Sequence, residues 1–188
     1  MYNYLLDRLP TEYEGYLIRT DYRIGMQIDM CLSDRSFPEE DRVLNALYLL
    51  YGNGIPDDFI IAYKGLVWFM SCGEKELTDE EIADAARENE NLNNDFLEPL
   101  EYETKANDNT LSFEQDSKLV YSAFKKCFNI DLARSSLHWF EFIALLSDIK
   151  DCKMNDVIDI RTINIKDVDK KYKQKVRELK QQYAIKNN

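Results

Sequence analysis

Few residues of this 188-residue chain have the type and spacing needed for chemistry. Its one histidine, His138, stands beside Trp139 in an apolar stretch, and no local signature supplies a nucleophile for it to activate. We therefore interpret His138 as a helix-start residue that donates a hydrogen bond to the backbone. The four cysteines are Cys31, Cys72, Cys127 and Cys152. They form no CxxC pair, which excludes the usual zinc modules and redox dithiols.

Paired carboxylates give no stronger indication of a site. The pairs Asp57-Asp58 and Glu80-Glu81 each fall in a predicted first helical turn, where the helix dipole already explains acidic residues. The sequence contains neither a glycine-rich phosphate loop nor a calcium-binding loop. It therefore predicts no catalytic, cofactor-binding or metal site, and we do not expect an enzyme.

Four residues are candidates for contact with a macromolecular partner. They are Trp68, Trp139, Phe140 and Arg161. The three aromatic residues stand at helical spacing among Leu and Ile, which is also typical of a buried core. Arg161 is a single cation in an apolar setting, so a structural ion pair with Asp116 or Asp131 is the alternative. The sequence leaves both roles open.

Charge is distributed unevenly along the chain. The net charge of −11 argues against a general affinity for nucleic acid or for an anionic membrane. Residues 74–116 hold 15 acidic and 3 basic residues, whereas residues 166–186 hold 8 basic and 3 acidic ones. We interpret both segments as solvated faces, with mutual attraction as the alternative. Neither a signal peptide nor a membrane-spanning apolar run is recognisable, so we expect a cytoplasmic protein.

The first half of the chain predicts a hairpin followed by helices. Residues 12–21, aromatic and β-branched around Gly15, favour a short β-hairpin or extended arm. Thr20 or Asp21 can then cap a first helix that runs to Leu32.

Two further helices are predicted before residue 74. A capping box at residues 36–39 opens the second helix, and residues 52–54 (Gly-Asn-Gly) end it. Pro56 suits the first turn of the third helix, which ends at Gly73.

The next segment, residues 74–111, is predicted to be a mostly irregular acidic linker, although Thr78 and Glu81 can cap a short helix within it. Residues 112–115 form another capping box. Ser135 or Ser136 caps a dense apolar helix.

A short apolar element then follows at residues 154–160, and an amphipathic helix at about residues 167–183 ends the chain. These elements predict a mainly α fold, an irregular bundle of about six helices with a short N-terminal β-hairpin. Residues 112–188 are expected to pack on residues 1–73 as one compact unit.

Several of these segments together resemble a known family. The matching pieces are Leu9-Pro10, Thr20-Asp-Tyr-Arg23, Ile55-Pro-Asp-Asp58, Cys72-Gly73, Phe113-Glu-Gln-Asp116, Phe128-Asn-Ile-Asp-Leu132, Leu137-His-Trp-Phe140 and Val157-Ile-Asp-Ile-Arg161. Their order and spacing resemble the bacteriophage gene-product-fifteen family over most of the chain outside the acidic linker. Phe140 stands where the family tends to have a second Trp, and Asn129 where it tends to have Gly. Asn also tolerates the left-handed backbone conformation.

The resemblance implies a phage tail-assembly chaperone that keeps the tape-measure protein soluble in the host bacterial cytoplasm. It implies no catalytic or cofactor-binding residue. The expected partner is the tape-measure protein or another tail protein, and self-association stays open. A structural tail connector retained in the virion is the first alternative. An acidic DNA mimic is a weaker one, because an Asn-rich linker is a poor scaffold for phosphate-like spacing.

Overall fold

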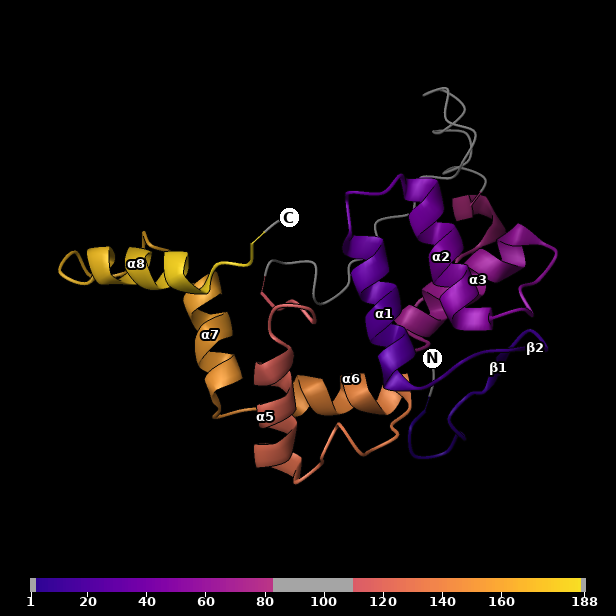
Figure 1. The fold of residues 1–188 in the computed structure, drawn as a ribbon, viewed down its shortest axis with the longest axis horizontal. Coiled ribbons are helices and arrows are strands. Elements are labelled where there is room, and N and C mark those ends of the chain that lie inside the picture. The colour runs from indigo at the N-terminus through magenta and orange to yellow at the C-terminus, as the bar shows by residue number, and fades with distance from the viewer. Residues whose placement is uncertain (1–2, 83–109, 187–188) are drawn as a thin grey trace. The chain divides into compact units, whose positions relative to one another are not determined.

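The computed structural model describes residues 3–82 and 110–186 and confirms a mainly α chain with a small N-terminal hairpin (Figure 1). The strands are β1 (Glu12–Tyr13) and β2 (Tyr16–Leu17). The described helices are α1 (Tyr22–Ser33), α2 (Glu39–Tyr51), α3 (Phe59–Met70), α5 (Ser117–Phe128), α6 (Trp139–Asp148), α7 (Lys153–Thr162) and α8 (Lys173–Tyr183).

These elements belong to two compact units. Unit 1 contains Met1–Thr104 and Leu137–Ile143, and therefore includes α1, α2, α3 and the start of α6. Unit 2 contains Lys105–Ser136 and Ala144–Asn188, and therefore includes α5, α7 and α8. Most of the predicted acidic linker, residues 83–109, lies outside the described residues. The packing of the two halves as one unit stays a prediction.

The predicted hairpin and first helix cap are confirmed in unit 1. Strands β1 and β2 pair antiparallel, and the two residues between them, Glu14 and Gly15, have φ values of 50° and 82°. Positive φ at both turn positions matches the right-handed twist of a two-residue hairpin. Asp21 is the N-cap of α1, since its carboxylate accepts the backbone N–H of Arg23 at 2.9 Å.

The predicted start of α2 is wrong by about two residues. The N-cap is Pro38, whose ψ of 148° is extended, so the helix cannot begin earlier than Glu39. Ser36 does not act as the cap, and its N–H instead donates to the carboxylate of Asp34. The predicted stop at Gly52 is confirmed, because this residue is the C-cap with φ of 63°.

The predicted start of α3 is also shifted. Pro56 precedes the helix, and Asp58 is the N-cap, with its carboxylate 2.8 Å from the backbone N of Ile60. At the start of a helix, an Asp side chain accepts a hydrogen bond from a backbone N–H that has no partner within the helix. A Pro at the first helical position would only remove one such N–H. The capping box at Thr78 and Glu81 is confirmed: the Glu81 N–H donates to the Thr78 hydroxyl at 3.2 Å, and the Thr78 N–H donates to Glu81 at 2.7 Å.

In unit 2 the capping box at Ser112 is only half right. The Gln115 N–H donates to the Ser112 hydroxyl, but the Ser112 N–H donates to Asp116 instead of to Gln115. The helix α5 then runs from Ser117 to Phe128, and its C-cap is Asn129, whose φ of 56° confirms that Asn takes the left-handed conformation here.

The last helix is shorter than the sequence predicts. Turns occupy much of residues 165–172, α8 begins at Lys173, and none of its residues is buried. The α8 helix contacts α7 within unit 2 (Figure 1).

A close approach of α1 to Trp139 organises the core of unit 1. A Cβ added at Gly25 would lie 2.2 Å from ring atoms of the buried Trp139 side chain, so only glycine allows this contact. The Trp139 ring stacks on Phe142 with a centroid distance of 5.8 Å, and Phe142 stacks on Tyr22 of α1 at 4.9 Å. The start of α6 is therefore packed directly on α1.

This contact predicts that Gly25→Ala destabilises the protein. An Ala inside a helix normally gains about 1 kcal/mol over Gly. Here overpacking against Trp139 should outweigh that gain and leave a net loss of about 1–2 kcal/mol. Thermal and urea unfolding would measure it. Gly54→Ala, whose added Cβ would meet only the Tyr51 carbonyl oxygen at 3.6 Å, is the control and should change little.

A buried carboxyl predicts that stability falls as pH rises. Asp29 of α1 is buried, and burial raises its pKa from 3.8 to about 6. The unfolded chain loses this proton near pH 4 and the folded chain near pH 6, so the stability contributed by the neutral carboxyl is lost over that interval. Asp29→Asn should remove about 2–3 kcal/mol of this pH dependence. Urea unfolding between pH 4 and 7 tests it, and Glu12→Gln, an exposed carboxyl, should reproduce the wild-type profile.

Candidate functional site

His138 is the N-cap of α6. The Nδ1 atom of its ring accepts a hydrogen bond from the backbone N–H of Phe140 at 3.0 Å. The backbone N–H of His138 donates to the carboxylate of Glu141, also at 3.0 Å. The Glu141 bond is that of a capping box, while the imidazole caps the N–H of the second helical residue in place of the usual hydroxyl. The predicted caps Ser135 and Ser136 are wrong, because the chain stays non-helical until Trp139.

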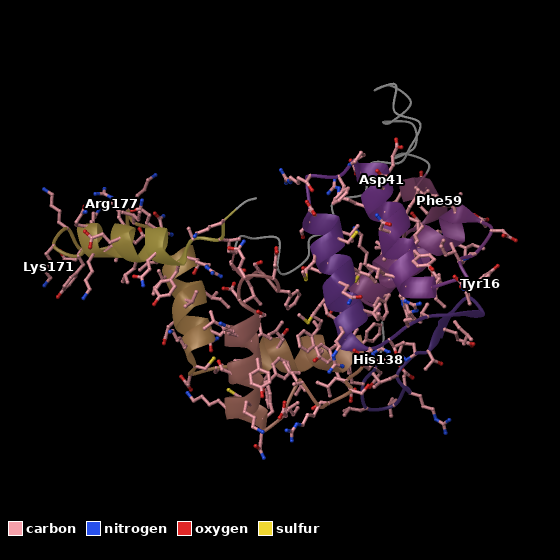
Figure 2. The ribbon with its side chains drawn as sticks, viewed as in Figure 1. Tyr16, Asp41, Phe59, His138, Lys171 and Arg177 are labelled. Atoms are coloured by element: carbon pink, nitrogen blue, oxygen red, sulfur yellow. The ribbon has the colours of Figure 1, made fainter. Side chains whose placement is uncertain are left out.

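The second ring nitrogen of His138 fixes its tautomer. Because Nδ1 accepts a hydrogen bond from the backbone N–H of Phe140, Nε2 carries the ring hydrogen and donates a hydrogen bond to the carbonyl oxygen of Pro10 at 2.8 Å. Burial lowers the pKa of His138, which favours this neutral form. The interpretation of His138 as a helix-start residue that donates to the backbone is confirmed (its place at the start of α6 is seen in Figure 2). With both nitrogens engaged, the ring is held as a structural link.

The three aromatic candidates lie together around this helix start. Trp68 of α3 is 5.6 Å from Phe140 and 5.2 Å from Tyr13, measured between ring centroids. Trp139 and Phe140 are both buried, whereas Trp68 is half-buried. Phe69 lies 6.4 Å from Trp139 and 6.0 Å from Phe140. The structure thus brings these residues into one cluster in unit 1, and a partner contact by them stays a prediction.

The fourth candidate, Arg161, forms a buried ion pair in unit 2. Its Nη1 and Nη2 donate to the two carboxylate oxygens of Asp116 at 2.6 and 2.9 Å, so the pair is bidentate. The Arg161 side chain is 8% exposed and that of Asp116 is 6% exposed. Of the two predicted partners, Asp116 is therefore the one used. Asp131 instead accepts the hydroxyl of Tyr121.

Arg161 also binds two backbone carbonyls from distant parts of unit 2. Its Nε donates to Tyr183 at the end of α8 (2.7 Å), and its Nη1 donates to Thr110 (2.8 Å). A further bond joins α8 to the same residue, because the Lys180 ammonium donates to the backbone carbonyl of Arg161 at 2.6 Å. One guanidinium therefore fastens the approach to α5, the end of α7 and the end of α8. The planar guanidinium of Arg, with its fixed set of donors, suits this role, whereas the ammonium group of Lys, a single point charge, does not.

The sequence reasoning missed a turn that displays two leucines. Residues 3–7 form a closed turn, which we call the leucine turn. The backbone N–H of Asp7 donates to the Asn3 carbonyl at 2.8 Å, and the Asn3 N–H donates to the Asp7 carboxylate at 2.8 Å. The Tyr4 hydroxyl donates to the Phe140 carbonyl, while Leu5 and Leu6 are 94% and 82% exposed.

A second surface was also missed, on the outer side of α2. It consists of Phe37, Glu40, Asp41, Leu44 and Tyr48, and we call it the α2 ridge. All five side chains are exposed. Glu40, Asp41, Leu44 and Tyr48 lie on one side of α2, next to its buried stripe, and Phe37 immediately precedes the helix. The apolar pair Leu44 and Tyr48, at i and i+4 beside a stripe that is already apolar, was the signal that could have revealed the ridge.

The described residues hold neither a cluster of metal-binding side chains nor a membrane-spanning helix. Over residues 3–82 and 110–186, no group of three or more His, Cys, Asp or Glu side chains could hold a metal ion. Within the same ranges, no helix has both the length and the apolarity needed to cross a bilayer.

The Arg161 pair predicts a strong and asymmetric response to mutation. Asp116→Ala should destabilise the protein by about 3–5 kcal/mol, because it leaves a buried guanidinium without its counter-charge. Arg161→Met combined with Asp116→Leu should cost clearly less than Asp116→Ala alone, since neither charge is then buried unpaired.

Chemical denaturation would measure these losses, and the rate of tryptic cleavage within α8 would report release of that helix. Arg134→Met is the matched control, because the exposed Arg134–Asp131 pair in the same unit should contribute about 0.5 kcal/mol or less. Equal losses in the control and in Asp116→Ala would contradict the anchoring role of Arg161.

Comparisons with known proteins bear on the whole chain. No curated protein and no solved structure matches it. A family model described as Bacteriophage Gp15 protein matches residues 5–185 of the 188. This match covers both units and agrees with the resemblance seen in the sequence. The chain therefore belongs to the bacteriophage Gp15 protein family.

Proposed function

We propose that this protein is a tail-assembly chaperone, which binds the tape-measure protein in the host cytoplasm and keeps it soluble while the tail forms. Membership of a phage family supports this proposal, together with the resemblance of that family to tail-assembly proteins. The observation that carries it is the leucine turn, where a strongly acidic chain exposes two adjacent leucines on a hydrogen-bonded support.

Exposed leucines suit a helical client. An amphipathic helix presents apolar side chains at i, i+3, i+4 and i+7, and such a stripe packs against apolar side chains held on a firm base. Tyr4 supplies that base, because its hydroxyl ties the turn to the backbone of Phe140 at 3.3 Å. Leu5 and Leu6 then need little ordering when a client arrives, which favours binding.

The net charge of −11 also suits a chaperone, because it keeps the protein and its client dispersed. A protein that exposes apolar surface risks association with itself, and a charge far from zero opposes this. The complex with an aggregation-prone client would inherit that charge and remain dispersed.

Co-expression with the tape-measure protein of the same phage tests the proposal. We expect the client to move from the insoluble to the soluble fraction and to copurify with the chaperone. Leu5→Asp with Leu6→Asp should strongly reduce the soluble client, because two carboxylates would replace the apolar contact. Ile60→Asp is the control: Ile60 is an exposed apolar residue in the first turn of α3, where a carboxylate suits the helix dipole, and its replacement should leave recovery unchanged.

The composition of purified virions separates this role from that of a structural connector. A chaperone that acts before the tail is complete should be absent from the particle by mass spectrometry. Stoichiometric presence in virions, or a client that stays insoluble in every co-expression, would contradict the proposal.

A further inference from the structure

The α2 ridge is an apolar strip bordered by acidic residues. Phe37, Leu44 and Tyr48 are 57%, 47% and 54% exposed; Leu44 and Tyr48 stand one turn apart on α2, and Phe37 lies just before the helix, ahead of the N-cap Pro38. Glu40 and Asp41, both exposed, stand in the first turn on either side of this strip. The buried stripe of α2 lies directly beside this strip, so the apolar face of the helix is wider than the part that the described residues cover.

The α8 helix has the complementary composition. Its apolar residues form a single strip that the described chain covers only in part: Tyr172, at the N-cap, is 53% exposed, while Val176 and Leu179 are half-buried. Lys171 and Lys175 are exposed and accompany this strip. The helix lies in the one strongly basic segment of the chain, residues 166–186.

The anchoring of α8 leaves its first turns accessible. Its carboxyl-terminal end is held by Arg161 at Tyr183 and by Lys180, and the segment beyond it is held by paired bonds between Lys186 and Gln115. Residues 170–177 are exposed except for the half-buried Lys173 and Val176. Side chains such as Lys171 and Arg177 extend outward from this end of the helix (Figure 2).

We propose that α8 of one copy of this chain packs on the α2 ridge of a second copy. Both surfaces are helical, apolar along one line and charged beside it, with lysines on one and carboxylates on the other. Copies that carry a net charge of −11 repel each other in general, so a lasting contact must bring opposite charges together, and these two surfaces do so. This assembly needs no client and does not rest on the proposed function.

The contact joins two different surfaces and is therefore heterologous. Each added copy leaves one α2 ridge and one α8 free, so the product is a closed ring or an open chain of copies. One helix from each copy provides less than the roughly 1,200 Å² typical of stable interfaces, so the assembly should depend on concentration.

Sedimentation velocity of the full chain over a wide concentration range tests the proposal. The wild-type mass should rise with concentration. Glu40→Lys with Asp41→Lys places positive charge opposite the α8 lysines and should raise the concentration needed for assembly about tenfold or more. Lys171→Glu with Lys175→Glu places negative charge opposite the ridge and should have the same effect.

Mixing the two charge-reversed proteins provides the decisive measurement. In the mixture each ridge again faces an α8 of opposite charge on the other protein, so assembly should return. This recovery requires contact between copies and also requires both variants to be folded. Asp57→Lys with Glu74→Lys, and Lys118→Glu with Lys153→Glu, change exposed residues outside both surfaces and match the two changes in net charge.

These controls should assemble as the wild type does. A wild-type protein that stays monomeric throughout the range, charge-reversed variants that assemble like the controls, or a mixture that remains monomeric would each overturn the proposal.

Discussion

The buried pair of Arg161 and Asp116 is the interaction on which the organisation of unit 2 depends. Burying two charges costs free energy that the pair recovers only with good geometry, and here the bond is bidentate. The same guanidinium binds the carbonyls of Thr110 and Tyr183, so a single side chain joins the approach to α5, the end of α7 and the end of α8. None of the residues of α8 is buried, so polar bonds such as this one, with those of Lys180 and Lys186, hold the helix in place.

Unit 1 uses a neutral imidazole for a comparable purpose. His138 caps α6 through Nδ1 and holds the segment before β1 through Nε2. The backbone around it also pairs with the start of α1, since the Trp139 N–H donates to the Thr20 carbonyl at 2.7 Å. A few directional bonds therefore position the aromatic cluster. Apolar packing, which has no direction of its own, then fills the space between the helices.

These anchors also explain how surfaces for association arise on a small acidic protein. The leucine turn is displayed because Tyr4 holds it to the backbone of Phe140. The first turns of α8 are displayed because Arg161 holds only the opposite end of that helix. In both cases a bond made inside a unit leaves neighbouring apolar side chains in solvent, where another chain can cover them. Binding through such surfaces needs shape and charge but no reactive group.

The sequence by itself determined the mainly α class and the cap at Thr78, because local spacing and backbone preferences set these features. It narrowed the N-terminal segment to a hairpin or an extended arm and the first helix cap to Thr20 or Asp21, and the structure shows the hairpin and Asp21. It also narrowed the partner of Arg161 to two aspartates. Only the tertiary structure decided between them, since distance along the chain does not give distance in space. Tertiary contacts likewise made His138 a cap and left α8 unburied, where amphipathic spacing alone predicted a packed helix. Periodicity shows which side chains share a face, but only the packed neighbours decide whether that face is covered.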